Sequence, residues 1–334
     1  MGEVVVTGGG GFIASHLIDR LLSDGENVTA FDINKELPEN LKHHAKNKNF
    51  NYVSGSLTDI NFLNSIIKKD TTTVYHLASV VGVKNYCTNP LGVIDVNVFG
   101  TRNLIEKAIK ENVKILFTST SEIYGKNPAV PWKEDSDRVL GSTNIDRWVY
   151  STTKSLCEHM LNAVHKCYGL PTVIVRYFNI YGPRQAPYFI IPANIHRVLN
   201  GKNPVVYDTG AQTRCFTFVS DAIEGTINAV KTKRADGETF NIGSSRENTM
   251  TEAVNEILKL SGKVDELSIE YKDTKDLYGS SYEDLDRRMP DTKKAKEFFE
   301  WEAKTSLNEG VRRTIEWVRE NTQWLRAELP KEIG

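Results

Sequence analysis

The chain has 334 residues, of which 40% are hydrophobic and 25% are charged, a composition typical of a globular protein with one large core or two moderate ones. Its 42 basic and 43 acidic residues give a formal net charge of −1, so no bulk positive field attracts nucleic acid or an anionic membrane. No apolar run reaches the roughly 20 residues needed to span a bilayer, and the chain does not begin like a signal peptide. These features predict a cytoplasmic protein that binds neither nucleic acid nor membrane.

The cysteines and histidines show no pattern typical of a metal site. Cys87, Cys157, Cys167 and Cys215 are scattered without CxxC spacing, and the seven histidines form no ligand pattern with them. We expect reduced cysteines that serve in packing, and no bound metal.

The first half of the chain alternates short β-branched runs with segments of helical periodicity. Such alternation predicts a parallel sheet covered by helices on both faces, because parallel strands need long crossover connections. The fold class expected is therefore α/β, a Rossmann-like doubly wound parallel sheet. The expected strands are Val4–Thr7, Val28–Phe31, Phe50–Gly55, Thr73–Leu77, Val113–Thr118 and Thr172–Tyr177.

Beyond Tyr177 glycines and prolines divide the chain into shorter segments, which predict a smaller α/β substrate-binding lobe. Helical patterns occupy Asp221–Lys231, Met250–Ser261 and Leu307–Leu325, and Phe240–Gly243 is expected to return to the main sheet as a strand. We therefore expect a nucleotide-binding domain over 1–178, with a returning segment near 215–245, and a substrate-binding lobe that takes up most of 179–334.

A glycine cluster directly follows the first expected strand and begins a helix. In Thr7-Gly8-Gly9-Gly10-Gly11-Phe12-Ile13-Ala14, Gly8 and Gly11 allow a tight turn and close approach to a pyrophosphate at a helix N-terminus. Gly8, Gly11, Phe12 and Ile13 are therefore candidate residues for binding a dinucleotide.

Asp32 ends the second expected strand, about twenty residues after the glycines, where a carboxylate can accept hydrogen bonds from ribose hydroxyls and repel a 2′-phosphate. This favours NAD over NADP as the cofactor. Two pairs of residues follow the third and fourth strands and are expected near the adenine and ribose: Ser56 with Leu57, and Leu77 with Ala78.

Candidate catalytic residues lie on one expected helix and at the end of one strand. Tyr150 and Lys154 are four residues apart, hence on one helix face, where an ammonium can lower the pKa of a phenol. The strand that ends at Thr118 continues into Thr120-Ser121-Glu122, so hydroxyls and a carboxylate leave the carboxyl end of a central strand.

Together these motifs resemble the extended short-chain dehydrogenase/reductases, in particular the NAD-dependent epimerases and dehydratases of nucleotide sugars. The resemblance spans roughly residues 3 to 325 and includes Arg176–Arg184 and Gln212–Phe216. Two positions depart from the family pattern: Ser56 stands where relatives often carry Asp, and Ala14 where many carry Gly.

The resemblance implies a role for each matching position. Tyr150 would be the general base that takes a proton from a sugar hydroxyl, Lys154 would hold the nicotinamide ribose, and Thr120 would hydrogen-bond the reacting oxygen. Ser121, Asn179, Arg184 and Arg214 would contact the substrate, with Arg214 the candidate for its diphosphate. The family also implies a homodimer, formed through helices near Pro90–Glu111 and Asp146–Tyr168.

Two features favour one reaction within the family. Thr120-Ser121-Glu122 resembles the pattern of UDP-glucuronate decarboxylases, in which Glu122 would handle protons, and Arg288 matches the arginine that these enzymes carry in an Arg-x-Pro context. The preferred hypothesis is oxidation at C4 of UDP-glucuronate, loss of CO2 and reduction to UDP-xylose. A UDP-sugar 4-epimerase, a nucleotide-sugar 4,6-dehydratase and a non-catalytic dinucleotide-binding regulator remain as alternatives.

Overall fold

A seven-stranded parallel sheet forms the centre of the computed structural model, which describes residues 2–274 and 285–327. The order β3-β2-β1-β4-β5-β6-β11 places the first strand in the interior, so the chain reverses direction along the sheet between β1 and β4. This is the arrangement of a doubly wound Rossmann-like fold, and it confirms the predicted fold class. The strands are β1 (Glu3–Thr7), β2 (Asn27–Asp32), β3 (Phe50–Ser54), β4 (Thr71–His76), β5 (Lys114–Thr120), β6 (Thr172–Tyr177) and β11 (Glu238–Ile242).

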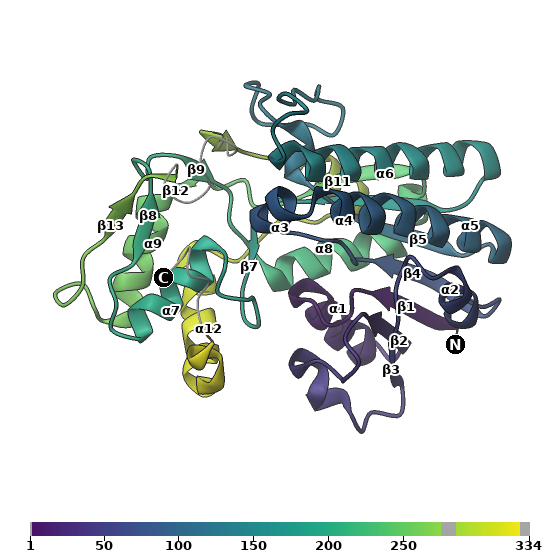
Figure 1. Cartoon of the computed structure of the whole chain (residues 1–334), viewed down its shortest axis with the longest axis horizontal. Coiled ribbons are helices and arrows are strands. Elements are labelled where there is room, and N and C mark those ends of the chain that lie inside the picture. The colour runs from purple at the N-terminus through teal and green to yellow at the C-terminus, as the bar shows by residue number, and fades with distance from the viewer. Residues whose placement is uncertain (1, 275–284, 328–334) are drawn as a thin grey trace.

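Helices cover both faces of the sheet because alternate strand residues point to opposite sides. Val4 and Val6 pack in a core with α1, α8 and α11, whereas Val5 packs in a second core with α2, α5 and α6. Figure 1 shows α5 and α6 together along one side of the sheet. The helices of the first face are α1 (Phe12–Ser23), α8 (Val219–Lys231) and α11 (Lys293–Phe299), and those of the second are α2 (Ile60–Ile66), α5 (Thr101–Glu111) and α6 (Arg147–Tyr168).

Shorter helical segments complete the nucleotide-binding half. Between β4 and β5 the chain forms α3 (Val83–Thr88), α4 (Pro90–Ile94) and the π-helical turn η2 (Asp95–Gly100) before α5 begins. The 3-10 turns η1 (Glu39–His44) and η3 (Ser121–Tyr124) follow β2 and β5, and η4 (Lys233–Ala235) precedes β11.

The second lobe has its own apolar core, built mainly on three helices (Figure 1). These are α7 (Ile190–Leu199), α9 (Met250–Ser261) and α12 (Leu307–Glu320). Short strands pair around them: β7 (Ile180–Tyr181) with β10 (Thr217–Phe218), β8 (Val205–Tyr207) with β13 (Glu270–Lys272), and β9 (Thr213–Arg214) with both β12 (Asn248–Thr249) and β14 (Arg287–Arg288). Parts of the predicted lobe, 275–284 and 328–334, lie outside the described residues.

Two sequence expectations about the second half can be compared with the structure. The strand expected at Phe240–Gly243 does return to the main sheet, as β11, and pairs in parallel with β6. The helix expected to reach Leu325 instead ends at Glu320, because Asn321 leaves the helical conformation and its side-chain amide donates to the Trp317 carbonyl oxygen at 2.8 Å. The turn η6 (Thr322–Arg326) follows.

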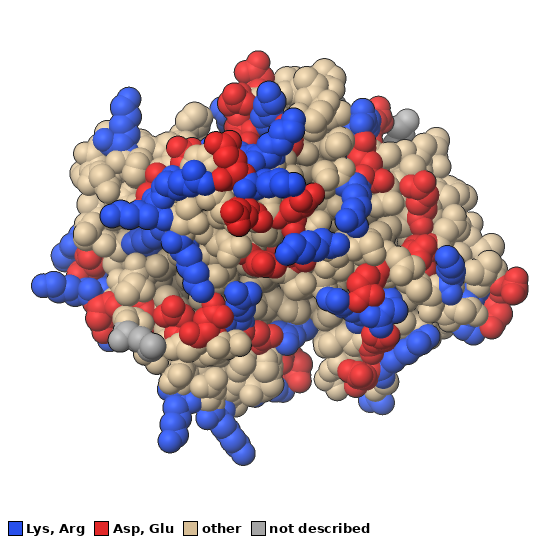
Figure 2. All heavy atoms as spheres, turned by 180° about the vertical axis from the view of Figure 1, so that it is seen from behind, with Lys and Arg blue, Asp and Glu red and all other residues tan. Residues whose placement is uncertain are grey.

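Charged side chains of both signs are interspersed over the face of the molecule in Figure 2, in keeping with the formal net charge of −1. Within the part of the chain that the structure describes, no helix combines the length and the apolar character needed to cross a membrane.

Candidate active site

A cavity of about 620 Å³ opens where the carboxyl ends of the central strands meet the second lobe. The sheet side contributes Gly8 after β1, Leu77 after β4 and Thr120 at the end of β5, and the lobe contributes Arg214 and Phe216. Open α/β sheets bind ligands at this edge. The cavity is therefore the candidate active site.

The glycine turn after β1 forms one end of the cavity. Gly8 has φ +68°, and a Cβ added there would lie 2.7 Å from the Ala78 Cα, so both its conformation and its surroundings require glycine. Gly11 precedes α1 without any side-chain cap among the described residues, which leaves first-turn N–H groups available to a phosphate. Phe12 and Ile13 also line the cavity. This end has the features needed to hold a pyrophosphate.

Asp32 also lines the cavity and is held beside the glycine turn. Its Oδ2 accepts a hydrogen bond from the Gly10 N–H at 3.1 Å, and its Oδ1 accepts one from the Ile33 N–H at 2.7 Å. A carboxylate fixed at this point can accept hydrogen bonds from ribose hydroxyls and would repel a phosphate at the 2′ position.

The four residues expected near the adenine and ribose are placed differently from one another. Leu77 and Ala78 line the cavity, whereas Ser56 and Leu57 are not part of its wall. The Ser56 hydroxyl pairs with the Thr58 hydroxyl at 2.8 Å, and the Leu57 side chain is buried, with its carbonyl oxygen accepting from the Asn103 amide at 3.2 Å. A cofactor contact by Ser56 or Leu57 therefore stays a prediction.

Tyr150 and Lys154 both lie on α6 and point into the cavity wall, as their spacing predicts. The Lys154 ammonium lies 5.9 Å from the centroid of the Tyr150 ring and donates a hydrogen bond to the Thr118 carbonyl oxygen at 2.8 Å. The backbone at the end of β5 thus anchors the lysine beside the phenol.

The expected lowering of the Tyr150 pKa by Lys154 is not found. Burial raises the pKa of Tyr150 well above its usual value, the Glu122 carboxylate raises it further, and hydrogen bonds with Ser79 and Thr120 act in the opposite direction. Burial also lowers the pKa of Lys154 to about 8. Removing both side chains from water changes their pKa values more than their proximity does. The spacing of residues along a helix does not reveal this burial.

Thr120, the last residue of β5, and the two residues that follow it have separate environments. The Thr120 hydroxyl lines the cavity and accepts a hydrogen bond from the Glu122 N–H at 3.2 Å, so it caps the turn η3. Glu122 also lines the cavity, whereas Ser121 is buried outside its wall. The structure therefore brings Thr120 and Glu122 to the predicted place, but not Ser121.

Arg288 reaches the same region from β14, far along the sequence. Its Nη1 lies 3.4 Å from the Glu122 Oε1, and its side chain is only 7% exposed. The structure thus places Glu122 and Arg288, the two residues that the sequence analysis associated with decarboxylation, next to each other.

Two substrate-side candidates from the second lobe line the cavity. Asn179 follows β6 with φ +43°. Arg214 lies on β9, where its Nη1 donates to the carbonyl oxygens of Thr213 and Leu285, each at 2.8 Å. Both residues are therefore positioned to contact a ligand that extends from the sheet into the lobe.

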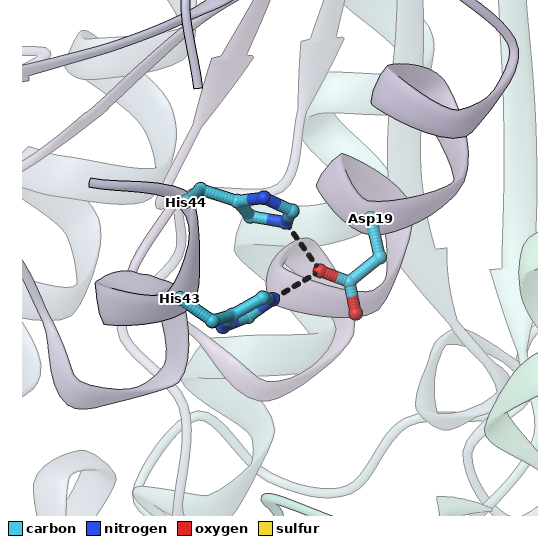
Figure 3. A group of neighbouring side chains, drawn as sticks. All are labelled: Asp19, His43 and His44. Atoms are coloured by element: carbon cyan, nitrogen blue, oxygen red, sulfur yellow. Dashed lines mark hydrogen bonds and ion pairs between the residues drawn. The ribbon is translucent and has the colours of Figure 1, made fainter. Parts of the chain in front are cut away.

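Arg184, which is predicted to contact the substrate, is not among the residues that line the cavity. Its guanidinium pairs with Asp19 of α1 at 2.7 Å and donates to the Ser15 hydroxyl at 3.4 Å. The other oxygen of the Asp19 carboxylate accepts from His43 at 2.8 Å and from His44 at 2.7 Å, which joins α1 to η1 (Figure 3). Arg184 links the segment after β7 to this cluster, and its positive charge opposes binding of a metal cation there.

Two further side chains of the cavity wall were missed by the sequence analysis. The Tyr86 ring stacks on the Tyr150 ring with centroids 4.9 Å apart and planes 9° apart, but nothing in the sequence associates these two residues. Arg147 is buried at the start of α6, and its Nη2 lies 3.9 Å from the Glu122 Oε1. Its position three residues before Tyr150 was an available signal, since residues i and i+3 share a helix face.

The Rossmann-like sheet, the glycine turn and the Tyr150/Lys154 pair are those of an NAD-dependent enzyme of the short-chain dehydrogenase/reductase class that acts on a nucleotide sugar. Over residues 5–314 the chain matches the model of the family described as GDP-mannose 4,6 dehydratase, and it belongs to that family.

Relatives of the chain include decarboxylases and an epimerase of nucleotide sugars. It is 39% identical to a UDP-N-acetyl-alpha-D-glucosaminuronate decarboxylase of Bacillus cytotoxicus, with 95% of this chain and 97% of the relative covered. UDP-glucuronic acid decarboxylase 1 of Arabidopsis thaliana is 32% identical, with 94% and 69% covered. A UDP-glucuronic acid 4-epimerase from Bacillus cereus, solved with UDP-glucuronic acid and NAD, matches with a TM-score of 0.84 and 27% identity over 96% of this chain and 99% of that one.

Proposed function

We propose that the protein decarboxylates a UDP-linked hexuronate, with UDP-glucuronate as the first candidate substrate and UDP-xylose as its product. The observation that carries this proposal is the buried approach of Arg288 to Glu122, 3.4 Å apart, in the cavity that also holds Tyr150 and Thr120. A guanidinium matches the geometry of a carboxylate, so Arg288 can bind the C6 carboxylate of a uronate.

NAD fits the sheet end of the cavity, where Gly8, the uncapped start of α1 and Asp32 would hold its pyrophosphate and adenosine ribose. Bound there, NAD would supply the acceptor for the C4 hydride and its return in the last step, and its positive nicotinamide ring would favour the Tyr150 phenolate.

Tyr150 acts as the base for the C4 hydroxyl in this proposal. Its phenolate removes the hydroxyl proton while the C4 hydrogen leaves as hydride, which oxidises C4 to a ketone. Thr120 would donate a hydrogen bond to the reacting oxygen, and Lys154, anchored by the Thr118 carbonyl, would hold a ribose hydroxyl of the cofactor and stabilise the phenolate.

The C6 carboxylate of the oxidised sugar is then a β-keto acid. When the C5–C6 bond breaks, its electron pair moves to C5 and on to the C4 oxygen, and C6 leaves as CO2. Tyr150 and Thr120 stabilise the resulting enolate oxygen through hydrogen bonds. A proton delivered to C5, with the Glu122 carboxyl group of the cavity wall as the candidate carrier, restores the ketone before its reduction.

A second substrate follows from the comparisons. Since the relative at 39% identity is a UDP-N-acetyl-alpha-D-glucosaminuronate decarboxylase, the 2-acetamido sugar is the alternative substrate for the same reaction. A 4-epimerase would reduce the ketone on its opposite face without losing C6. A 4,6-dehydratase would instead eliminate water from C5 and C6 of a neutral hexose, and a regulator without activity would bind NAD alone.

The product identifies the reaction. We expect that incubating the protein with NAD and either uronate, followed by proton NMR, gives a UDP-pentose that lacks C6. If UDP-galacturonate were the only product from UDP-glucuronate, the protein would be a 4-epimerase and not a decarboxylase. If neither uronate were converted while UDP-glucose gave a 4-keto-6-deoxy sugar, the dehydratase would be the answer.

The proposal includes a homodimer in the cytoplasm. Leu91 of α4, Phe99 of η2 and Leu156 of α6 are exposed apolar side chains, 72%, 58% and 46% accessible, on the helices expected to form the interface. Large exposed apolar groups of this kind often mark contacts between proteins. Sedimentation velocity should show a dimer that Leu156→Glu converts to a monomer; a monomeric parent protein would refute this assembly.

A further inference from the structure

The Tyr86 ring covers one face of the Tyr150 ring. Both side chains are buried, with 3% and 8% exposed, and both line the cavity. Their ring centroids are 4.9 Å apart and their planes differ by 9°. Because parallel rings in contact are about 3.5 Å apart, this is an offset stack, one of the arrangements that aromatic pairs prefer. Tyr86 therefore limits the directions in which the Tyr150 ring can move.

Tyr86 is itself fixed by its surroundings. It lies on the short helix α3, and its hydroxyl accepts a hydrogen bond from the Gly82 N–H at 2.9 Å, which ties the tip of the side chain to the start of that helix. Val93 of α4 belongs to the same apolar cluster as both rings. Since α3 and α4 follow β4 and Tyr150 lies on α6, the stack joins the segment after β4 to the helix that carries the proposed base.

Two hydroxyl groups define where the phenol oxygen of Tyr150 lies. Tyr150 hydrogen-bonds with the side chains of Ser79 and Thr120. The Ser79 hydroxyl donates in turn to the Asn97 Oδ1 at 3.0 Å, which holds it in place. Rotation of Tyr150 about its Cα–Cβ bond would carry the phenol oxygen away from both hydroxyls, and the Tyr86 ring opposes such rotation on the side that it covers.

We infer that Tyr86 is a positioning residue for the proposed base, because its ring holds the Tyr150 phenol where it can meet the C4 hydroxyl of the sugar. The inference goes beyond the proposed function and rests on it for the role of Tyr150. Tyr86 acts through Tyr150 and takes no part in moving the proton. A displacement of a reacting group by about 1 Å can lower a rate about a hundredfold. Loss of the Tyr86 ring should therefore slow turnover more than it weakens binding of the substrate.

The division of the effect between kcat and KM tests this role. Tyr86→Leu replaces the ring by an apolar group that cannot stack, whereas Tyr86→Phe keeps the ring and loses only the hydroxyl. With NAD and UDP-glucuronate, we expect Tyr86→Leu to lower kcat about tenfold or more and to change KM less than about threefold. Tyr86→Phe should restore kcat to within about threefold of the parent. Titration with NAD gives the concentration of binding sites to which each kcat refers.

Tyr75 provides a matched control for the loss of a buried ring. It lies on β4, is 3% exposed like Tyr86, and is not among the residues that line the cavity. Tyr75→Leu and Tyr86→Leu both remove a packed ring, so both should lower the free energy of unfolding. Only Tyr86→Leu should lower kcat, and Tyr75→Leu should leave kcat per NAD-binding site unchanged within about twofold.

Each other outcome overturns the inference. A kcat within about twofold of the parent in Tyr86→Leu would show that the stack does not position the base. A rise in KM alone would place Tyr86 at the substrate, and equal losses in the Leu and Phe variants would assign the effect to the hydroxyl. An equal loss of kcat in Tyr75→Leu would show a general effect of destabilisation. If Tyr86→Leu fails to bind NAD or to unfold cooperatively, Tyr86→Met takes its place with the same expectations.

Failure of the proposed function would be recognised separately. A parent protein that converts UDP-glucose but neither uronate would refute the decarboxylase. The Tyr86 variants would then be compared on UDP-glucose, because oxidation of that sugar also begins with removal of the C4 hydroxyl proton. A parent protein that oxidises none of these sugars would contradict the role of Tyr150 as the base, and this inference with it.

Discussion

Burial dominates the titration of the two side chains at the reaction centre. Lys154 is 2% exposed, and its removal from water lowers its pKa to about 8 from an ordinary 10.5, while burial moves the pKa of Tyr150 upward. Both shifts favour the neutral form of the side chain. Burial therefore favours Tyr150 as a neutral phenol, and we expect the positive nicotinamide ring of NAD to favour its ionisation.

The Lys154 shift predicts a pH dependence of stability. Between pH 8 and 10.5 this lysine is deprotonated in the folded chain and protonated in the unfolded one, so unfolding takes up a proton and the folded state gains stability as pH rises. Below pH 8 both states bind the proton and the cost of burying the charge is fully present. Lys154→Met lacks this cost, so its free energy of unfolding relative to the parent should decline by roughly 1 kcal/mol per pH unit across that window.

Urea unfolding of the parent and of Lys154→Met at pH 7, 8, 9 and 10 measures this difference. Taking the difference between the two proteins cancels other groups that titrate in the same range. A difference that stays constant from pH 7 to 10 would show that Lys154 keeps its ordinary pKa in the folded protein.

The sequence analysis found the candidate residues that stand at a characteristic spacing from a neighbouring motif. The pair Tyr150 and Lys154 has a fixed helical spacing, and Asp32 stands at a fixed distance from the glycines. Arg147 shares a helix face with Tyr150, but its approach to Glu122, on another element, cannot be read from that spacing. The sequence predicted a lowered pKa for Tyr150, whereas burial raises it. Burial depends on packing across the whole site, which helical spacing does not describe.

The turn from β1 into α1 shows how an element constrains its sequence. Gly8→Ala would place a Cβ 2.7 Å from the Ala78 backbone at φ +68°. Gly25, in the turn after α1, also has a positive φ, +84°, but nothing lies within 4 Å of its Cβ position. A substitution at Gly25 therefore introduces backbone strain alone, whereas one at Gly8 introduces both strain and steric overlap.

We expect Gly8→Ala to lower the free energy of unfolding by clearly more than about 1 kcal/mol and to weaken NAD binding, and Gly25→Ala to cost only about 1 kcal/mol through strain. Thermal unfolding and NAD titration of the two variants provide the comparison. Equal stabilities and equal NAD affinities in the two variants would show that the close approach of Gly8 to Ala78 has no consequence.

Two arginines with similar predicted roles lie on different elements, and we expect them to behave differently. Arg214 on β9 lines the cavity, whereas Arg184 after β7 pairs with Asp19 outside it. Arg214→Ala should raise the dissociation constant of UDP about tenfold or more, and Arg184→Ala should change it less than about threefold. Calorimetry with UDP measures both. A large loss of UDP affinity with Arg184→Ala would return that residue to the substrate site.

Elements were predictable to within about two residues where periodicity was strong. β2, β5 and β6 match their expected ranges closely, because β-branched runs bounded by turns mark buried strands. The end of α12 was misplaced because a single capping amide, that of Asn321, stops a pattern that continues apolar to Leu325. The position of Arg184 depends on a loop whose path no periodicity describes.

At the scale of the whole molecule, the fold class was predicted mainly from the order of strands and helices along the chain. Alternating strands and helices predicted the doubly wound sheet, and the return of β11 beside β6 was visible as a late β-rich segment. The division of the chain at residue 178 stays a prediction, since the chain crosses between the sheet and the lobe more than once. The placement of Arg288 opposite Glu122 required the complete fold, because 166 residues separate them.

Release of C6 as CO2 tests the proposed function most directly. UDP-glucuronate labelled with 13C at C6 would be incubated with the protein and NAD, and labelled CO2 would be measured together with the nucleotide-sugar product. We predict one CO2 for each UDP-pentose formed, no release by Tyr150→Phe, and release reduced about a hundredfold or more by Arg288→Met, which should still bind NAD. Turnover that retains the label in UDP-galacturonate, or full CO2 release by Arg288→Met, would contradict the account.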